Sequence, residues 1–363
     1  MTDESSGGGT AVTTAPLALE ERTTKKRLAD SIPTTRLGRI KEDLYYMRGR
    51  GALEISIVYL VIIIAFVVTS LLVPKSFPFL SSSNLSGVIS QSIPVLAILA
   101  IGAGILMIAG EFDLSLGAAL GFSAIVFIRL SEKGSWPVAF AAALASAIGI
   151  ALINGLIVVF TRIPSFIATL GMSFFWIGAS IFINGTTPAV LADGRTDLMV
   201  AIFAGNYGFF RSQLVWMIVI GAIGWFFLHR HKQGNRIYAV GGNAAAAKAV
   251  SIKPVAVKLL AFAIFGLMVG IAAVLISVRT SGMQPGTTGD YTLFAIAAAV
   301  VGGCSLTGGR GTIFGMIVGA ALIRTIENGL ILAKAPGFYV QLFVGLTIVI
   351  AASLNKLMEG KSQ

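Results

Sequence analysis

The sequence predicts an all-α polytopic membrane protein with about ten transmembrane helices and with both termini in the cytoplasm. Two observations support this fold class. Of the 363 residues, 56% are hydrophobic and 12% are charged, about half the charge of a soluble domain, and the mean hydropathy is +0.87. Residues 55–73 contain no ionisable group, and about 20 such residues cross the hydrocarbon core of a bilayer.

Apolar segments recur along most of the chain, separated by short polar connections. We expect spans at residues 55–73, 85–109, 114–130, 136–160, 165–184, 212–229, 259–279, 292–304, 313–331 and 338–354. The connection at residues 229–258 contains six Lys or Arg residues and no acid, so it should be cytoplasmic. With an even number of spans both termini lie on that side, and the charge-balanced loop at residues 185–211 lies outside.

The ends of the chain are expected to lie outside the membrane domain. We assign residues 1–54 to a cytoplasmic tail, residues 55–354 to the transmembrane domain and residues 355–363 to a second tail. Residues 1 to about 35 lack an apolar period and should be disordered. Leu37, Ile40, Leu44 and Met47 then recur at helical spacing among basic residues, which fits either an interfacial helix on an anionic membrane surface or a solvated linker.

Composition and motifs exclude several classes of function. The net charge of +11 follows from the positive-inside bias, so no nucleic-acid partner is expected. The single cysteine, Cys304, rules out an internal disulfide and a multi-thiolate metal site. His229 and His231 have no Cys or acid at ligand spacing, so we expect no metal site and no catalytic centre. The glycine-rich residues 302–312 lack the lysine of a phosphate-binding loop, so the chain should bind no cofactor.

The basic connection is expected to contain a short helix outside the membrane. Gly241 and Gly242 give a flexible entry, Asn243 is able to cap a helix, and Pro254 stops the helix before the next span. Such a helix suits insertion into a groove on a partner, and a loop that only connects two spans is the other interpretation. The residues assigned to this element are Gly241, Gly242, Asn243, Ala244, Ala245, Ala246, Ala247, Lys248 and Ser251.

Proline, glycine and alanine predict how the spans are shaped and packed. Pro94 lies inside the second span and the glycine-rich residues 302–311 lie between the eighth and ninth, so broken or re-entrant segments are expected at both places. Small residues four apart, such as Gly315 and Gly319, and the run at residues 141–147 let helix backbones approach closely in lipid.

Four segments resemble those of one known family. They are AGEFDLSLGA at residues 109–118 and the stretches at residues 153–171, 238–253 and 295–320, the last reading AIAAAVVGGCSLTGGRGTIFGMIVGA. Their order over most of the chain makes it similar to the membrane permeases of ribose-type (simple sugar) ATP-binding-cassette (ABC) importers. Ala249 and Val250 replace the Ser-Gly that usually ends the third segment.

The resemblance implies a set of partners around a subunit of the bacterial inner membrane. Two copies of the chain, or this chain with a close paralogue, would form the pathway among the membrane lipids. Two cytoplasmic ATPase subunits would bind ATP and Mg²⁺ and pull on residues 241–251. A periplasmic sugar-binding protein would deliver a monosaccharide or related polyol. Nucleosides or branched-chain amino acids are the alternative substrates, and an ion-coupled secondary transporter is the alternative class.

Polar and aromatic residues of the spans are candidates for the pathway or its gate, because polar groups are costly in lipid and a sugar needs hydroxyl partners and flat apolar faces. Glu111 and Asp113 lie at a cytoplasmic turn, where Asp113 either caps the next helix or takes part in gating or in a contact with the ATPase. Arg324 and Glu327 are three apart, which permits an ion pair that is either structural or part of the pathway or subunit interface. The other candidates are Gln91, Pro94, Asn154, Phe174, Trp176 and Asn328.

Overall fold

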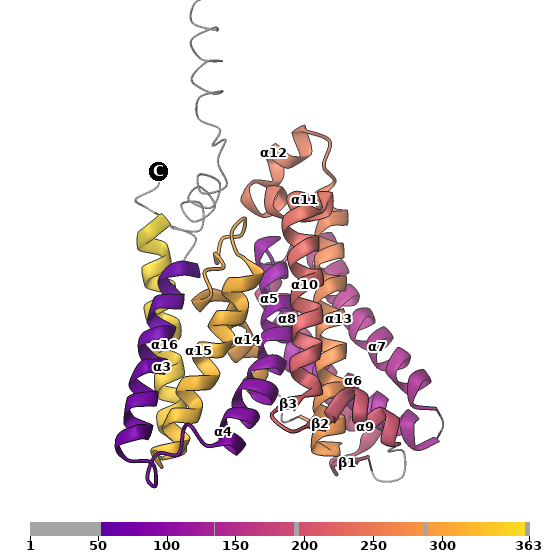
Figure 1. The fold of residues 1–363 in the computed structure, drawn as a ribbon. Coiled ribbons are helices and arrows are strands. Elements are labelled where there is room, and N and C mark those ends of the chain that lie inside the picture. Colours follow the sequence, from indigo (N-terminus) through magenta and orange to yellow (C-terminus); the bar gives the residue numbers. More distant parts are fainter. Residues whose placement is uncertain (1–51, 134, 192–195, 287–288, 360–363) are drawn as a thin grey trace, which may run out of the picture. The chain divides into compact units, whose positions relative to one another are not determined.

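The computed structural model describes residues 52–133, 135–191, 196–286 and 289–359 (Figure 1). The predictions for the tail at residues 1–35 and for a helix around Leu37 to Met47 lie outside these residues. The described part of the second tail, up to residue 359, continues the last helix.

Ten helical segments correspond to the ten expected spans and confirm the all-α fold class. Seven of the described helices are long and apolar enough to cross a membrane, and two shorter apolar stretches lie at Tyr291–Val301 and Gly337–Thr347. The segments are α3 (Ala52–Leu72), a composite of α4 (Ser82–Gly87), the π-helix η1 (Val88–Ser92) and α5 (Ile93–Ile108), then α6 (Leu116–Lys133), α7 (Trp136–Thr161), α8 (Ser165–Asn184), α10 (Ser212–Arg230), α13 (Pro254–Thr280), α14 (Gly289–Val301), α15 (Ile313–Leu332) and α16 (Gly337–Glu359).

Two further helices lie beyond the bundle between α10 and α13, namely α11 (Lys232–Gly242) and α12 (Ala244–Ala249). The basic connection at residues 229–258, which contains no Asp or Glu, lies at this end of the bundle. We refer to this end as the cytoplasmic end. The start of α3 and the end of α16 lie at this same end (Figure 1), as the even number of spans requires.

The connection at residues 185–211, at the outer end, contains secondary structure that the sequence analysis did not predict. It contains α9 (Asp197–Ala204) and the short strands β1 (Ala189–Val190), β2 (Asn206–Tyr207) and β3 (Phe210–Arg211). β1 pairs with β4 (Gly282–Met283), and β2 pairs with β3. Phe203 of α9 is buried against the rings of Phe140 and Trp216, so burial of apolar side chains orders this connection.

The core is centred on α5, all 16 of whose residues are buried. Helices α10, α13, α14 and α15 all contact it. By contrast, α3 and α8 expose many large apolar side chains, as expected of surfaces that face lipid or another subunit.

Small residues let several helices touch backbone to backbone, as predicted. A methyl group added to Gly319 would overlap the carbonyl oxygen of Ala298 on α14, and one added to Gly266 of α13 would lie 2.7 Å from the carbonyl oxygen of Ala147 on α7. In lipid, such close approach replaces the hydrophobic drive that holds helices together in water.

The interruption predicted at the glycine-rich residues is present, whereas the second span is not broken at Pro94: it continues as one helix over Ser82–Ile108 with a π-helical stretch. The π-helix η1 ends immediately before Ile93 and Pro94, which open α5, because proline has no backbone N–H and disfavours helix before it. After α14, which at 13 residues covers only about 20 Å, residues 302–312 leave the helical path. Gly303, Gly308 and Gly309 there have positive φ angles, which glycine adopts without strain.

We predict that Gly319→Ala lowers the melting temperature of the detergent-solubilised protein by several degrees, because overpacking a tight contact costs about 1–3 kcal/mol. Gly178→Ala is the matched control, since a methyl group there meets no atom within 4 Å and alanine favours helix. Equal melting temperatures for the two variants, measured by thermal size-exclusion chromatography, would contradict the packing argument.

Candidate functional site

The short helix predicted in the basic connection is α12. The side-chain oxygen of Asn243 accepts a hydrogen bond from the amide of Ala246 at 2.9 Å and caps it. Two details of the prediction are wrong. Gly241 and Gly242 form the last turn of α11 rather than a flexible entry, and Pro254 opens α13 rather than ending α12.

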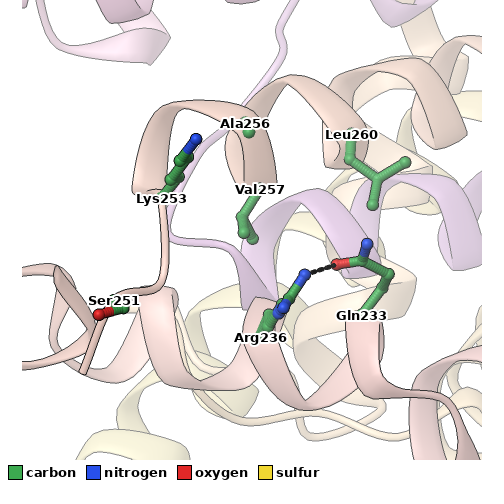
Figure 2. Close-up of a pocket in the computed structure, with 7 residues that line it drawn as sticks. All are labelled: Gln233, Arg236, Ser251, Lys253, Ala256, Val257 and Leu260. Atoms are coloured by element: carbon green, nitrogen blue, oxygen red, sulfur yellow. Dashed lines mark hydrogen bonds between the residues drawn. The ribbon is translucent and has the colours of Figure 1, made fainter.

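Helix α12 ends at a turn that contains a residue with left-handed backbone angles. Ser251 has φ 63°, and its amide bonds to the carbonyl of Lys248 at 3.1 Å. This turn ends the helix after Ala249 and leads the chain into α13. Beside it, a pocket opens between α11 and the first turns of α13 (Figure 2).

One face of α12 is open to solvent although it is apolar. Ala247 is buried, whereas Ala245, Ala246 and Ala249 are exposed, and the following Val250 is 70% exposed. An apolar surface at the aqueous end of a membrane protein is typical of a contact site for another protein.

Four glycines from three distant segments fix α11 and α12 to the bundle, and we call this contact the glycine junction: Gly110, Gly241, Gly308 and Gly309. A methyl group on Gly241 would overlap the carbonyl oxygen of Ile108 and lie 2.8 Å from the amide nitrogen of Gly309. That amide donates a hydrogen bond to the same Ile108 carbonyl at 2.9 Å. Only glycine at residue 241 allows the end of α5 and the turn before α15 to meet α11.

A second bond reinforces the junction. The hydroxyl of Tyr238 on α11 donates to the carbonyl oxygen of Gly311 at 2.7 Å. The amide of Gly110 bonds to the carbonyl of Met107 at 2.8 Å, which closes the end of α5 beneath Gly241. Helix α11 is therefore attached to the end of α5 and to the turn before α15 by the backbone contact at Gly241 and by the Tyr238 hydroxyl.

The turn after α5 is held by side chains that the sequence argument had singled out. Glu111 forms an ion pair with Lys258 of α13, a pairing that the sequence did not reveal. Asp113 accepts hydrogen bonds from the amide and hydroxyl of Ser115 at 2.7 and 2.6 Å and from the amide group of Asn154 at 2.9 Å. Asp113 thus holds the turn before α6, which begins at Leu116, but it does not cap the helix as predicted, because it bonds to no amide of the first helical turn.

Two effects act on the pKa of Asp113 in opposite directions. Burial raises the pKa of Asp113 to about 6, while its bonds with Asn154 and Ser115 act to lower it. The side chain of Asn154, fully buried on α7, also bonds to the Ser115 hydroxyl at 2.7 Å. The three residues form one closed network that connects α6 to α7.

The ion pair predicted between Arg324 and Glu327 is present. The Arg324 guanidinium also lies over the rings of Tyr291 and Phe294 on α14, 5.9 and 5.3 Å from their centroids. Asn328 does not join this pair. It exchanges two hydrogen bonds with Asn84 of α4, at 2.8 and 3.1 Å, and so ties α15 to the second span.

The remaining candidates do not converge on one cavity. Trp176 packs edge-on against Phe122 of α6, with ring centroids 5.4 Å apart, and Phe174 is 70% exposed on α8. Gln91 is half-buried in η1 and Pro94 is buried in α5. In the described parts of the chain, no hydrogen bond or ring contact joins the candidates of α8 to those of the second span.

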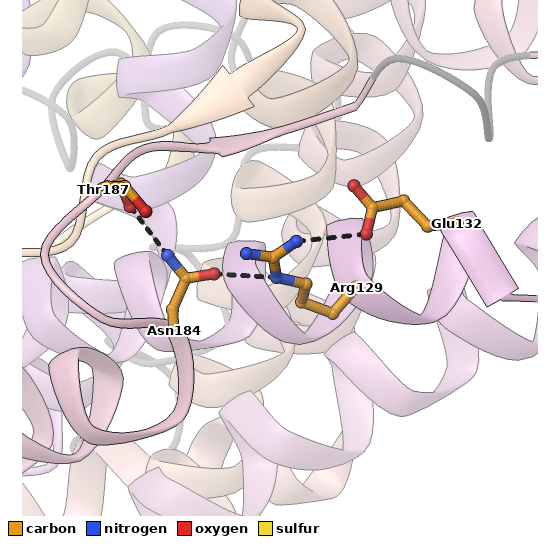
Figure 3. A network of polar contacts seen from close by, with 4 residues as sticks. All are labelled: Arg129, Glu132, Asn184 and Thr187. Carbon is orange, nitrogen blue, oxygen red and sulfur yellow. Dashed lines mark hydrogen bonds and ion pairs between the residues drawn. The ribbon is translucent and has the colours of Figure 1, made fainter.

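The outer end contains polar groups that the sequence argument missed. Arg129 of α6 donates to the side-chain oxygen of Asn184 at 2.9 Å and pairs with Glu132, and Asn184 donates to the carbonyl of Thr187 at 2.8 Å (Figure 3). This network fixes the chain that leads into β1. No group of three His, Cys, Asp or Glu residues lies close enough to hold a metal ion within the described ranges.

A pocket of about 570 Å³ opens beside β1 and β4 at the outer end. Its polar lining includes Thr280, Gln284 and Tyr291, and Tyr291 also contacts Arg324. Among the residues that the structure describes, no carboxylate, Lys or Arg lines it. Neither spacing nor periodicity predicts this pocket, because its lining comes from four separate elements.

Comparisons with known proteins agree over most of the chain. Residues 84–352 match the family described as branched-chain amino acid transport system / permease component. The ribose import permease protein of Escherichia coli (strain K12) is 32% identical, covering 85% of this chain and 94% of that protein. The D-allose transport system permease protein of the same strain is 30% identical, covering 77% and 85%. No solved structure matches the chain.

The family match begins in the second span and ends in the last one. The xylose transport system permease protein of Haemophilus influenzae, 28% identical, covers 84% of this chain and 97% of its own length. These matches confirm the resemblance stated from the four sequence segments. The chain belongs to the permease family of ABC importers, as a multi-pass membrane subunit that is not itself catalytic because ATP hydrolysis takes place on separate subunits.

Proposed function

We propose that this chain translocates a monosaccharide or related polyol across the bacterial cytoplasmic membrane. A periplasmic binding protein delivers the sugar, and cytoplasmic ATPase subunits that bind ATP and Mg²⁺ drive the import. A second permease copy, identical or paralogous, completes the pathway. The names of the relatives, which are permeases for ribose, D-allose and xylose, support this substrate class.

The observation that carries the proposal is the exposed apolar face of α12, attached through the glycine junction to α5. Small side chains at Ala245, Ala246 and Ala249 allow close approach by a partner. Because Gly241 contacts the end of α5 directly, a force on α12 reaches the most buried helix of the bundle. An ATPase that binds this face is therefore able to reshape the pathway.

The described lining of the outer pocket contains no charged side chain, which supports a neutral substrate. An amino acid carries a carboxylate and an ammonium group, and both would lose their hydration beside a lining that offers no countercharge. A sugar presents hydroxyl groups, which suit the hydroxyl and amide groups of Thr280, Tyr291 and Gln284. The name of the family keeps branched-chain amino acids as the second candidate.

An ion-coupled mechanism has less support. It would need a titratable group free to exchange protons or ions near the membrane centre. The group on α15 best placed for this, Glu327, is paired with Arg324.

Reconstitution in proteoliposomes tests the function. The chain is purified with the ATPase and binding protein encoded beside it, and uptake of labelled pentoses, hexoses, polyols and branched-chain amino acids is measured. We expect ATP-dependent uptake of one or a few sugars. Uptake of leucine instead of sugars would select the second candidate, and uptake driven by an ion gradient without ATPase would contradict the proposal.

We predict that Ala245→Asp and Asn243→Pro each abolish ATP-driven uptake while the protein still inserts and folds. The first places a charge on the exposed face of α12. The second removes the cap and demands φ near −65° where the backbone has −159°. Asn235→Asp, which adds a charge to the exposed side of α11, is the control and should retain uptake. Normal uptake in either α12 variant would remove α12 from the coupling role.

We predict that Gly241→Ala uncouples the ATPase from transport, whereas Gly242→Ala does not. A methyl group at residue 241 forces α11 away from α5, and one at residue 242 meets no atom within 4 Å. The measurement is the stimulation of ATP hydrolysis by the sugar-loaded binding protein in proteoliposomes. Equal stimulation in both variants would show that the glycine junction does not transmit the movement.

A further inference from the structure

The pocket between α11 and α13 has a volume of about 310 Å³ and is used by none of the roles described above (Figure 2). Its polar side is formed by Gln233 and Arg236 of α11 with Ser251 and Lys253 of the turn before α13. Its apolar side is formed by Ala256, Val257 and Leu260, on the first two turns of α13. The lining of the pocket therefore combines two cationic side chains with three apolar ones.

The charge of the polar side is not neutralised within the chain. Arg236 donates to the side-chain oxygen of Gln233 at 3.3 Å (Figure 2), and neither Arg236 nor Lys253 forms an ion pair with a residue that the structure describes. Residues 229–258 contain no acid. Glu111, the acid that reaches α13, is paired with Lys258. Two exposed cations in a concave site attract an anion.

The position of the pocket matches a membrane surface. Leu260 lies seven residues beyond Lys253, about 10 Å along α13 toward the membrane centre. Helix α11 is amphipathic: Gly234, Ile237 and Val240 are buried, and Lys232 and Arg236 are exposed. The buried residues of α11 pack against the bundle, so its exposed cations face outward beside the end of α13 that enters the membrane, where phosphate groups of lipids gather.

We propose that this pocket binds one anionic phospholipid of the cytoplasmic leaflet. Its phosphate lies between Arg236 and Lys253, where the guanidinium and ammonium groups donate charge-assisted hydrogen bonds. The first methylene groups of an acyl chain pack against Val257 and Leu260. Because the lipid contacts both α11 and α13, it sets the angle at which α11 presents α12, and lipid composition thereby regulates coupling.

The test is native mass spectrometry of the full-length chain in detergent, titrated with phosphatidylglycerol or phosphatidylcholine. Each cation near a phosphate contributes about a fivefold factor in affinity. We expect one phosphatidylglycerol to bind more tightly than phosphatidylcholine. Arg236→Gln or Lys253→Gln should weaken that binding about fivefold, and the double variant about thirtyfold. Lys232→Gln, which removes one charge from the same helix outside the pocket, should change it less than twofold.

Three results would overturn the proposal. Equal losses from Lys232→Gln and from Arg236→Gln would indicate general surface charge rather than a pocket. Displacement of phosphatidylglycerol by an excess of inorganic phosphate would identify a free-anion site. If the double variant weakens binding of the ATPase but leaves the lipid titration unchanged, the cations belong to the ATPase interface. Because lipid binding is measured without substrate or ATP, its failure would leave the proposed import function standing.

Discussion

The backbone contact of Gly241 with the carbonyl of Ile108 and the amide of Gly309 is the constraint on which the arrangement of the cytoplasmic end depends. Any side chain at residue 241 would separate α11 from α5. Direct backbone contact has no flexible side chain to absorb a displacement, and close-packed interiors transmit strain. The contact therefore joins the surface that a partner touches to the helix at the centre of the bundle.

The two ends of the bundle differ in the chemistry that they offer. The cytoplasmic end is basic, with an apolar helix for a protein partner and a cationic pocket beside it. The outer end offers a pocket whose described lining combines hydroxyl and amide groups with apolar side chains. Between them, α5 is buried along its whole length, and the π-helical stretch η1 gives the second span a weak point outside α5. Movement at one end is able to reach the other through this helix.

Local patterns in the sequence predict much of this structure, but they do not predict contacts between residues that are far apart in the chain. Hydropathy predicts the spans, Asn243 predicts the cap of α12, and Pro94 marks the place where the second span changes from π-helix to α-helix. The pairs Glu111–Lys258 and Asn84–Asn328 join residues 147 and 244 positions apart, and no period or spacing relates them. The glycine junction was not predicted for the same reason. The sequence around Gly241 does not show whether this glycine lies in a flexible turn or in a tight backbone contact.

The most direct test of coupling through the glycine junction is a distance measurement by electron spin resonance. With Cys304 replaced by serine, spin labels are placed at Ala246 on α12 and at Phe112 in the turn after α5, and the complex with its ATPase is measured without nucleotide and with trapped ATP. The account predicts one narrow distance that is the same in both states, and a broad or nucleotide-dependent distance in Gly241→Ala. A distance that changes by several ångströms with ATP in the unsubstituted junction would contradict it.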